Sequence, residues 1–210
     1  MLLAIAFWTA VTISWIAISY VVISFIEFVS HGVFMHKPTW LSANSKFFKE
    51  TLNEHRTFHH GHCFPGRHFD EADEHDCVTI NIHLRVFFGQ LASCWMWGPL
   101  FIAALILGVG STAGKVLILG GFTFMLLLML HHITWNFIHV QMHKTRESRD
   151  QWFAASKLCL YLARYHYIHH VYPRSNFCVV CPLADWLMGT FRPANGKDIA
   201  DLKQRGFFLD

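Results

Sequence analysis

The sequence contains little charge, and several familiar binding motifs are absent from it. Charged residues make up 15% of the 210 residues and hydrophobic residues 53%, which is more apolar than an average soluble domain. There is no G-x-G-x-x-G segment after a strand pattern and no His-Pro-Gly-Gly segment, so neither a nucleotide-binding domain nor a fused haem domain is expected. No nucleic-acid-binding motif is present, and a net charge of +3 does not indicate a nucleic-acid partner.

Regular cysteine spacing is also absent. The six cysteines are irregularly spaced and do not predict a disulfide framework. Cys178 and Cys181 form the single C-x-x-C pair, which is a weak signal for zinc or redox chemistry without a second pair. Their role is left open.

The N-terminus lacks the basic segment and the small-residue cleavage site of a secretory signal peptide. Instead, residues 2–28 form an apolar run, and about 20 residues suffice to span a bilayer. Two more apolar runs, 86–109 and 116–138, flank a short turn, and Gly98-Pro99 is a potential kink in the first of them. We therefore predict a single membrane-embedded domain, residues 1–210, as an all-α bundle with about three spanning helices.

The basic residues predict the orientation of these spans. Of the 17 lysines and arginines, only Lys115 lies between the last two apolar runs, so the other sixteen fall on one side. The positive-inside rule makes that side cytoplasmic. Because the main histidine clusters fall on the same side, we expect a multi-pass membrane protein with a cytoplasmic helical cap that carries a di-metal site. Which membrane it occupies is left open.

Histidine is unusually abundant, with 16 residues in the chain. A buried imidazole has two ring nitrogens that need partners, and a metal ion satisfies several imidazoles at once. Ten histidines lie in four clusters, the second and fourth of them on helices expected over 46–60 and 151–171. These candidate ligands are His31, His36, His55, His59, His60, His139, His143, His166, His169 and His170. His83 and His132 are possible extra ligands.

The spacing within the clusters suits helices, with one exception. His139 and His143 have the i, i+4 spacing of a helical chelate, and His166, His169 and His170 share one helical face. Residues five apart, such as His31 and His36, lie about 140° apart around an α-helix. We therefore expect a bend between those two, and Gly32 would permit it.

Several polar residues could orient the ligands by accepting hydrogen bonds from their second ring nitrogens. The candidates are Glu27, Glu54, Asn136 and Asp185. Simpler roles stay open for three of them. Glu27 could be an interfacial carboxylate, Asn136 a structural hydrogen-bonding residue between helices, and Asp185 a helix cap.

The order H-x4-H, H-x3-HH, H-x3-H, H-x2-HH resembles the histidine boxes of the fatty acid hydroxylase/sterol desaturase superfamily. The text around the first box, residues 27–37, is similar too. So is the segment after the last box, with Asn176-Phe177 and then residues 182–190. The second box has one more spacer residue than many hydroxylases of the family, and Cys178 stands where glycine is common. These differences leave the substrate and subfamily open.

The resemblance implies an O2-dependent di-iron oxidoreductase that hydroxylates or desaturates an aliphatic lipid, such as a fatty acyl or sterol-like molecule. Its cofactors would be two iron ions, with O2 as co-substrate, although zinc can occupy such a site in a purified protein. No carrier domain is evident, so an external electron donor such as cytochrome b5 or ferredoxin is expected. The basic residues available for its docking are Lys144, Arg146, Arg149, Lys157 and Arg164.

Two other classes of function remain open. A membrane zinc enzyme, such as a hydrolase, needs about three protein ligands, fewer than the ten histidines available. A metal transporter usually binds its ion near the bilayer midplane, whereas most of these histidines lie beyond the apolar runs. Iron content and O2 consumption distinguish these alternatives from the oxidoreductase.

Overall fold

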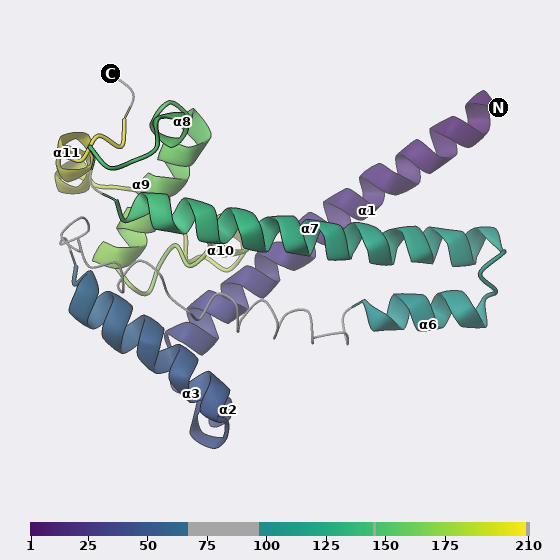
Figure 1. Cartoon of the computed structure of the whole chain (residues 1–210), viewed down its shortest axis with the longest axis horizontal. Coiled ribbons are helices and arrows are strands. Elements are labelled where there is room, and N and C mark those ends of the chain that lie inside the picture. Colours follow the sequence, from purple (N-terminus) through teal and green to yellow (C-terminus); the bar gives the residue numbers. More distant parts are fainter. Residues whose placement is uncertain (67–96, 145, 209–210) are drawn as a thin grey trace. The chain divides into compact units, whose positions relative to one another are not determined.

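A computed structural model of the chain describes residues 1–66, 97–144 and 146–208 (Figure 1). All of the regular secondary structure in these ranges is helical, so the all-α prediction is confirmed for them. The chain divides into two units, residues 1–23 with 83–133 and residues 24–82 with 134–210. Each unit is considered by itself.

Two helices in the described ranges are long and apolar enough to cross a membrane. One is α1 (Leu2–Val29), which a π-helix, η1 (Ser30–Met35), continues without interruption, and the other is α7 (Thr112–Met142). Within the first unit they approach closely at Gly120, where a Cβ atom would lie 2.3 Å from the Trp15 ring. The Trp15 indole also donates a hydrogen bond to the Val116 carbonyl, at 3.0 Å. Small residues of this kind let apolar helices pack backbone to ring.

The prediction of three spanning helices is corrected to two in the described ranges. The middle run was placed over 86–109, but the helix found there, α6 (Gly98–Ile106), has nine residues, against about 20 for a full span. Residues 86–96 lie outside the described part of the chain. Pro99 lies in the first turn of α6, where a proline needs no intrahelical donor, so it begins a helix and does not kink one.

In the second unit, three helical elements follow η1. They are α2 (Trp40–Asn44), α3 (Lys46–Leu52) and a second π-helix, η2 (Asn53–Cys63). A capping box starts α2, because Thr39 and Ser42 exchange side-chain to backbone hydrogen bonds of 3.1 and 2.8 Å. The helix predicted over 46–60 is present as α3 and η2 in succession.

The single helix predicted over 151–171 is two helices, α8 (Gln151–Ala154) and α9 (Lys157–Val171). Ser156 has extended backbone angles, and its hydroxyl accepts the Cys159 N–H at 3.2 Å. This N-cap starts α9 separately, so the earlier residues form only a short turn of helix.

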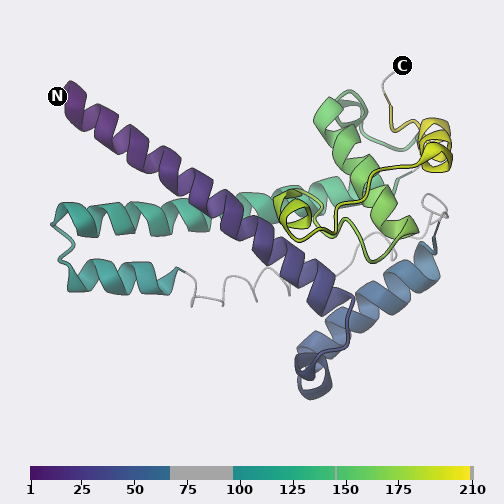
Figure 2. The same cartoon turned by 180° about the vertical axis from the view of Figure 1, so that it is seen from behind.

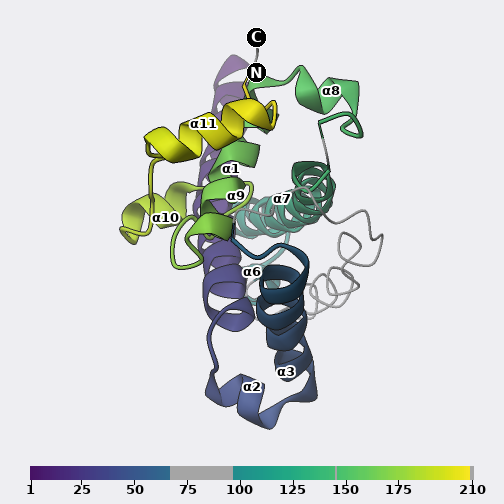
Figure 3. The same cartoon turned by 90° about the vertical axis from the view of Figure 1, so that its left-hand side faces the viewer.

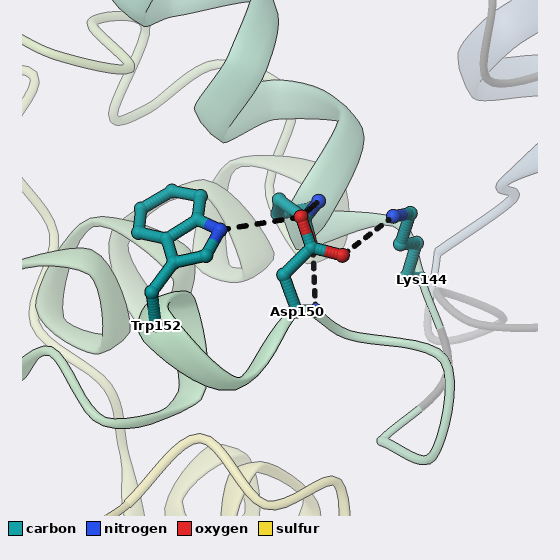
Figure 4. Close-up of polar contacts among 4 residues, drawn as sticks. Lys144, Asp150 and Trp152 are labelled. Carbon is teal, nitrogen blue, oxygen red and sulfur yellow. Dashed lines mark hydrogen bonds and ion pairs between the residues drawn. The ribbon is translucent and has the colours of Figure 1, made fainter.

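The connection between α7 and α8 is organised by Asp150 (Figure 4). Its carboxylate accepts hydrogen bonds from the side chains of Gln141, at 2.8 Å, and Trp152, at 3.2 Å. Lys144 forms an ion pair with the same carboxylate at 3.4 Å. These contacts fix the chain directly after the last turn of α7, which carries His139 and His143.

The C-terminal region after α9 is also helical. It contains α10 (Leu183–Leu187) and α11 (Gly196–Gln204), the latter started by a capping box of Asn195 and Asp198. Within the second unit, α10 lies beside the end of α1, where the Ser24 hydroxyl accepts the Ala184 N–H at 2.8 Å (Figure 2). Similarly, α11 lies beside α9, where the Tyr167 hydroxyl donates to Asp201 at 3.1 Å (Figure 3).

Arg149 belongs to the core of this unit. It is buried, its guanidinium lies 3.8 Å from the centre of the Phe207 ring, and it donates a hydrogen bond of 2.7 Å to the Arg205 carbonyl. Arg164 is half-buried and donates to the Phe207 carbonyl at 2.8 Å. Of the five basic residues expected to attract an electron carrier, Arg146 and Lys157 are therefore the ones with exposed side chains.

Candidate metal centre

All ten candidate histidines lie in the second unit, in two groups of five. Within each group, one ligand atom of every residue lies within 4.8 Å of the others. Group A consists of His31, His36, His55, His60 and His169. Group B consists of His59, His139, His143, His166 and His170.

The π-helices explain the spacing that an α-helix could not. His31 and His36 are five residues apart at η1, and His55 and His60 are five apart in η2. The i→i+5 ladder of a π-helix widens the turn, so residues five apart come to nearly the same side. Both pairs therefore join group A. The expected bend at Gly32 is replaced by a local widening of the helix.

The two α-helices supply ligands at the ordinary chelate spacing. At the end of α7, His139 and His143, the residue that follows the helix, are four residues apart and both join group B. On α9, His166 and His170 are four apart and join the same group, whereas His169 joins group A. Both α9 and η2 therefore contribute to both groups.

The ligand nitrogens converge closely. In group A, His55 Nε2 lies 2.9 Å from His31 Nε2 and 3.1 Å from His36 Nε2. His169 Nε2 is 3.1 Å from the Nε2 atoms of both His36 and His60. In group B, His166 Nε2 lies 3.1 Å from the Nε2 atoms of His143 and His170.

The two groups adjoin each other. The rings of His60 and His170, one from each group, stack with centroids 4.1 Å apart. The rings of His55 and His59 also stack across the boundary, at 5.1 Å. Two ions held by these groups would therefore lie next to each other, separated by the stacked imidazole rings.

Backbone carbonyls determine which ring nitrogen of His31 and of His169 faces group A. The Nδ1 atom of His169 lies 2.8 Å from the Ser175 carbonyl oxygen, and the Nδ1 atom of His31 contacts the Phe177 carbonyl oxygen. Because a carbonyl oxygen only accepts, each Nδ1 carries the proton, and Nε2 presents a lone pair. A metal ion between the two rings would satisfy lone pairs that converge in this buried space.

Burial keeps these imidazoles neutral. It lowers the pKa of His36 to about 2 and that of His169 to about 4, and in His36 the neighbouring His169 adds to the effect. The hydrogen bond to Ser175 and the charge of Asp185 oppose the shift in His169. The pKa values of His55, His60, His166 and His170 are also well below normal, again mainly through burial and then through neighbouring histidines. Neutral imidazole is the form that binds metal.

The donor set fits a transition-metal ion with more than four ligands. Ligands about 2.1 Å from an ion are about 3.0 Å apart at right angles and about 3.4 Å apart in a tetrahedron. The Nε2 separations of 2.9 to 3.1 Å match the right-angled arrangement. Five imidazoles also exceed the four ligands of a structural zinc site. Imidazole suits iron, zinc, copper and nickel, so the donors by themselves do not select one metal.

Aromatic rings enclose both groups. The Phe177 ring contacts the rings of His31, His36 and His169, with centroids 5.7 to 6.4 Å apart. The Phe64 ring contacts those of His59, His143 and His170, at 4.1 to 5.9 Å. Trp135, one turn before His139, stacks on it at 4.6 Å. These rings limit the access of water to the nitrogens.

The acidic candidates lie at different places around the groups. The carboxylates of Glu27 and Asp185 are buried and accept backbone N–H groups of residues 177–181, the segment that contacts His31. Glu54 is half-buried in the first turn of η2. Asn136 is half-buried on α7.

His132 belongs to neither group, and His83 lies outside the described residues. The contributions of Ser175 and Phe177 were missed from the sequence. Both act through backbone carbonyls. Because every residue has a backbone carbonyl, the residue type does not indicate this role.

The cysteines play no part in either group. Cys178 and Cys181 are buried free thiols, and burial, followed by the charge of Glu27, raises the pKa of each above the usual range. Protonated thiols are poor metal ligands. Cys63 is disulfide-bonded, which the irregular cysteine spacing did not predict.

Gly32 permits the close approach of η1 and Phe177. A Cβ atom at Gly32 would lie 2.8 Å from the Phe177 ring. We expect Gly32→Ala to lower the free energy of unfolding by about 1–3 kcal/mol, because the ring must move out of a packed position. Gly61→Ala, in the other π-helix, is the matched control, since its Cβ would only meet the Arg56 carbonyl at 3.5 Å. Thermal unfolding of both variants tests this, and equal stability of the two would contradict it.

Comparison with known proteins adds no relative. No protein-family model, no curated protein and no solved structure matches the chain. The function must therefore be inferred from the geometry of the two histidine groups.

Proposed function

We propose that the chain is an O2-dependent di-iron oxidoreductase of the membrane that hydroxylates or desaturates an aliphatic lipid. The observation that supports this most strongly is the pair of adjacent five-histidine groups. Group A would hold one ion and group B the other. When bound, the ions would supply the activation of O2 that cleavage of an unactivated C–H bond requires and that no side chain can provide. The histidine boxes resemble those of the fatty acid hydroxylase/sterol desaturase superfamily, which favours the same reaction.

The residues of the chain would contribute binding, orientation and exclusion of water. Nine of the ten imidazoles are buried and His36 is half-buried, and together they would bind two ions without adding negative charge to the centre. The carbonyls of Ser175 and Phe177 orient two of the rings. The aromatic rings of Phe64, Trp135 and Phe177 shield the groups from water, which favours oxidation of an apolar substrate over side reactions.

The position of the groups supports an apolar substrate taken from the bilayer. His31 directly follows α1, and His139 and His143 occupy the last turns of α7 and the residue after it. The positive-inside rule favours the cytoplasmic side for the site.

The electrons would come from a separate protein. Each turnover with O2 needs two reducing equivalents from outside the substrate, and a small acidic carrier such as cytochrome b5 or ferredoxin would provide them. Of the five basic residues expected to attract the carrier, Arg146 and Lys157 have exposed side chains. Their charges would mainly raise the rate of association with such a carrier.

The alternatives fit the donor set less well. A zinc hydrolase leaves most of the ten imidazoles without a purpose, since catalytic zinc takes about three protein ligands. A transporter needs a path for its ion, whereas both groups are enclosed by aromatic rings and lie at the ends of the apolar helices.

Purification without oxygen, followed by iron determination and O2 uptake, tests the proposed function. We expect about two iron ions per chain and uptake of O2 that requires both a reductant and a lipid extract. The oxidised lipid would be identified by mass spectrometry. Bound zinc without O2 uptake after iron reconstitution would refute the proposal and favour the hydrolase.

A further inference from the structure

The loop between α9 and α10 contacts one histidine group. The Ser175 carbonyl is bonded to His169 Nδ1, and the Phe177 carbonyl contacts His31 Nδ1. The Phe177 ring contacts these two rings and that of His36. All three histidines belong to group A. The loop therefore fixes both the direction and the protonated nitrogen of ligands to one of the two ions.

Two buried carboxylates hold this loop by five consecutive backbone N–H groups. Asp185 accepts those of the first two residues of 177–181, at 3.0 and 2.7 Å. Glu27 accepts those of the last three, at 2.6, 2.9 and 2.9 Å. The Thr190 hydroxyl also donates to Asp185, at 2.6 Å. All of these partners are donors, and their hydrogen bonds reach both oxygens of each carboxylate.

We propose that Glu27 and Asp185 are positioning residues for the ion of group A alone, acting through the loop 175–181 on His31 and His169. The inference rests on the proposed di-iron function and adds that the two ions are held unequally. If the backbone of 177–181 shifts, the Phe177 carbonyl leaves His31, whose ring can then turn or change its protonated nitrogen. Group B takes its ligands from α7, η2 and other positions of α9.

The experiment compares the wild type with Glu27→Gln and Asp185→Asn, purified in detergent and loaded with iron(II). An amide replaces one acceptor oxygen by an NH2 group, which then faces a backbone N–H. After addition of excess chelator, we expect one of the two ions to dissociate about 10- to 100-fold faster than in the wild type, while the other dissociates at the wild-type rate. Thr190→Val, which removes only one donor to Asp185, should accelerate loss of the same ion by a smaller factor.

Asp198→Asn is the matched control. Asp198 is also a buried carboxylate that accepts a backbone N–H, that of Asn195 at 2.9 Å, but it lies in the cap of α11. The Asp198→Asn variant should have a lower unfolding temperature, and both of its rates of iron loss should equal those of the wild type. Retention of both ions at wild-type rates in the Glu27 and Asp185 variants would overturn the inference. So would equal acceleration of both ions, or one-ion loss in the control. A wild type that binds no iron would instead refute the proposed function, and the inference with it.

Discussion

His169→Ala and His139→Ala will each reduce turnover by more than about 100-fold, because each removes an imidazole that faces one of the two ions. His169 belongs to group A and His139 to group B, so the pair of variants tests both halves of the centre. Both side chains are buried, at 0% and 1% exposure, so water cannot easily take their place. The measurement is lipid oxidation per chain, with the iron content of each variant determined in parallel.

Membrane insertion should survive both substitutions. Insertion depends on the apolar residues of α1 and α7 and not on the metal. His62→Ala is the matched control, since His62 lies on η2 two residues after His60, is exposed and belongs to neither group. It should keep wild-type turnover. Substantial turnover in His169→Ala or His139→Ala would exclude that residue as a ligand.

The sequence predicted which histidines come together but not how they divide. Two features were enough to select the ten residues: the chelate spacings, and the side of the membrane assigned to the segments between the apolar runs. Both depend on local periodicity in the sequence. The division depends on the widened turns of η1 and η2, which put His60 in group A and His59 in group B. A π-helix is stabilised by its surroundings and has no sequence pattern of its own, so an α-helical reading could not place these two neighbours.

The remaining differences have equally local causes. The helix expected over 151–171 is interrupted at Ser156, whose N-cap role competes with an unbroken apolar pattern. The basic residue Arg149 lies buried over Phe207, a contact between distant segments that no local pattern in the sequence predicts. Glu27 and Asp185 were recognised as candidates that could orient ligands. That they hold a backbone loop was not predicted, because it depends for Glu27 on a contact with Val179, 152 residues away, and for Asp185 on how the chain turns back between α9 and α10.

Acid will release the metal and destabilise the chain over a narrow pH range. In the folded state, burial lowers the pKa of His36 to about 2 and of His169 to about 4, and lowers those of His55, His60, His166 and His170. In the unfolded chain, histidine titrates near ~6.5. Above that pH both states are neutral, and these groups do not affect stability. As the pH falls below ~6.5, the unfolded chain binds protons that the folded chain cannot, so stability falls with pH.

The magnitude makes this the steepest expected response of the protein. Each imidazole that stays neutral while its unfolded counterpart is protonated costs about 1.4 kcal/mol per pH unit. Several such residues together reach the total stability of a typical domain, about 5–15 kcal/mol, within one or two pH units. We therefore expect the metal-free protein to unfold between about pH 6 and pH 5, with the helical signal in circular dichroism as the measurement.

Bound iron should shift that transition to lower pH, because protons and metal compete for the same nitrogens. Iron loss should begin where the metal-free protein starts to lose stability, and turnover should fall with it. A slow release of iron could mimic resistance to acid, so exchange with added ⁵⁷Fe at each pH is the control. If exchange is rapid and both iron content and turnover stay constant down to pH 5, buried imidazoles do not hold the metal, and the assignment of the two groups is wrong.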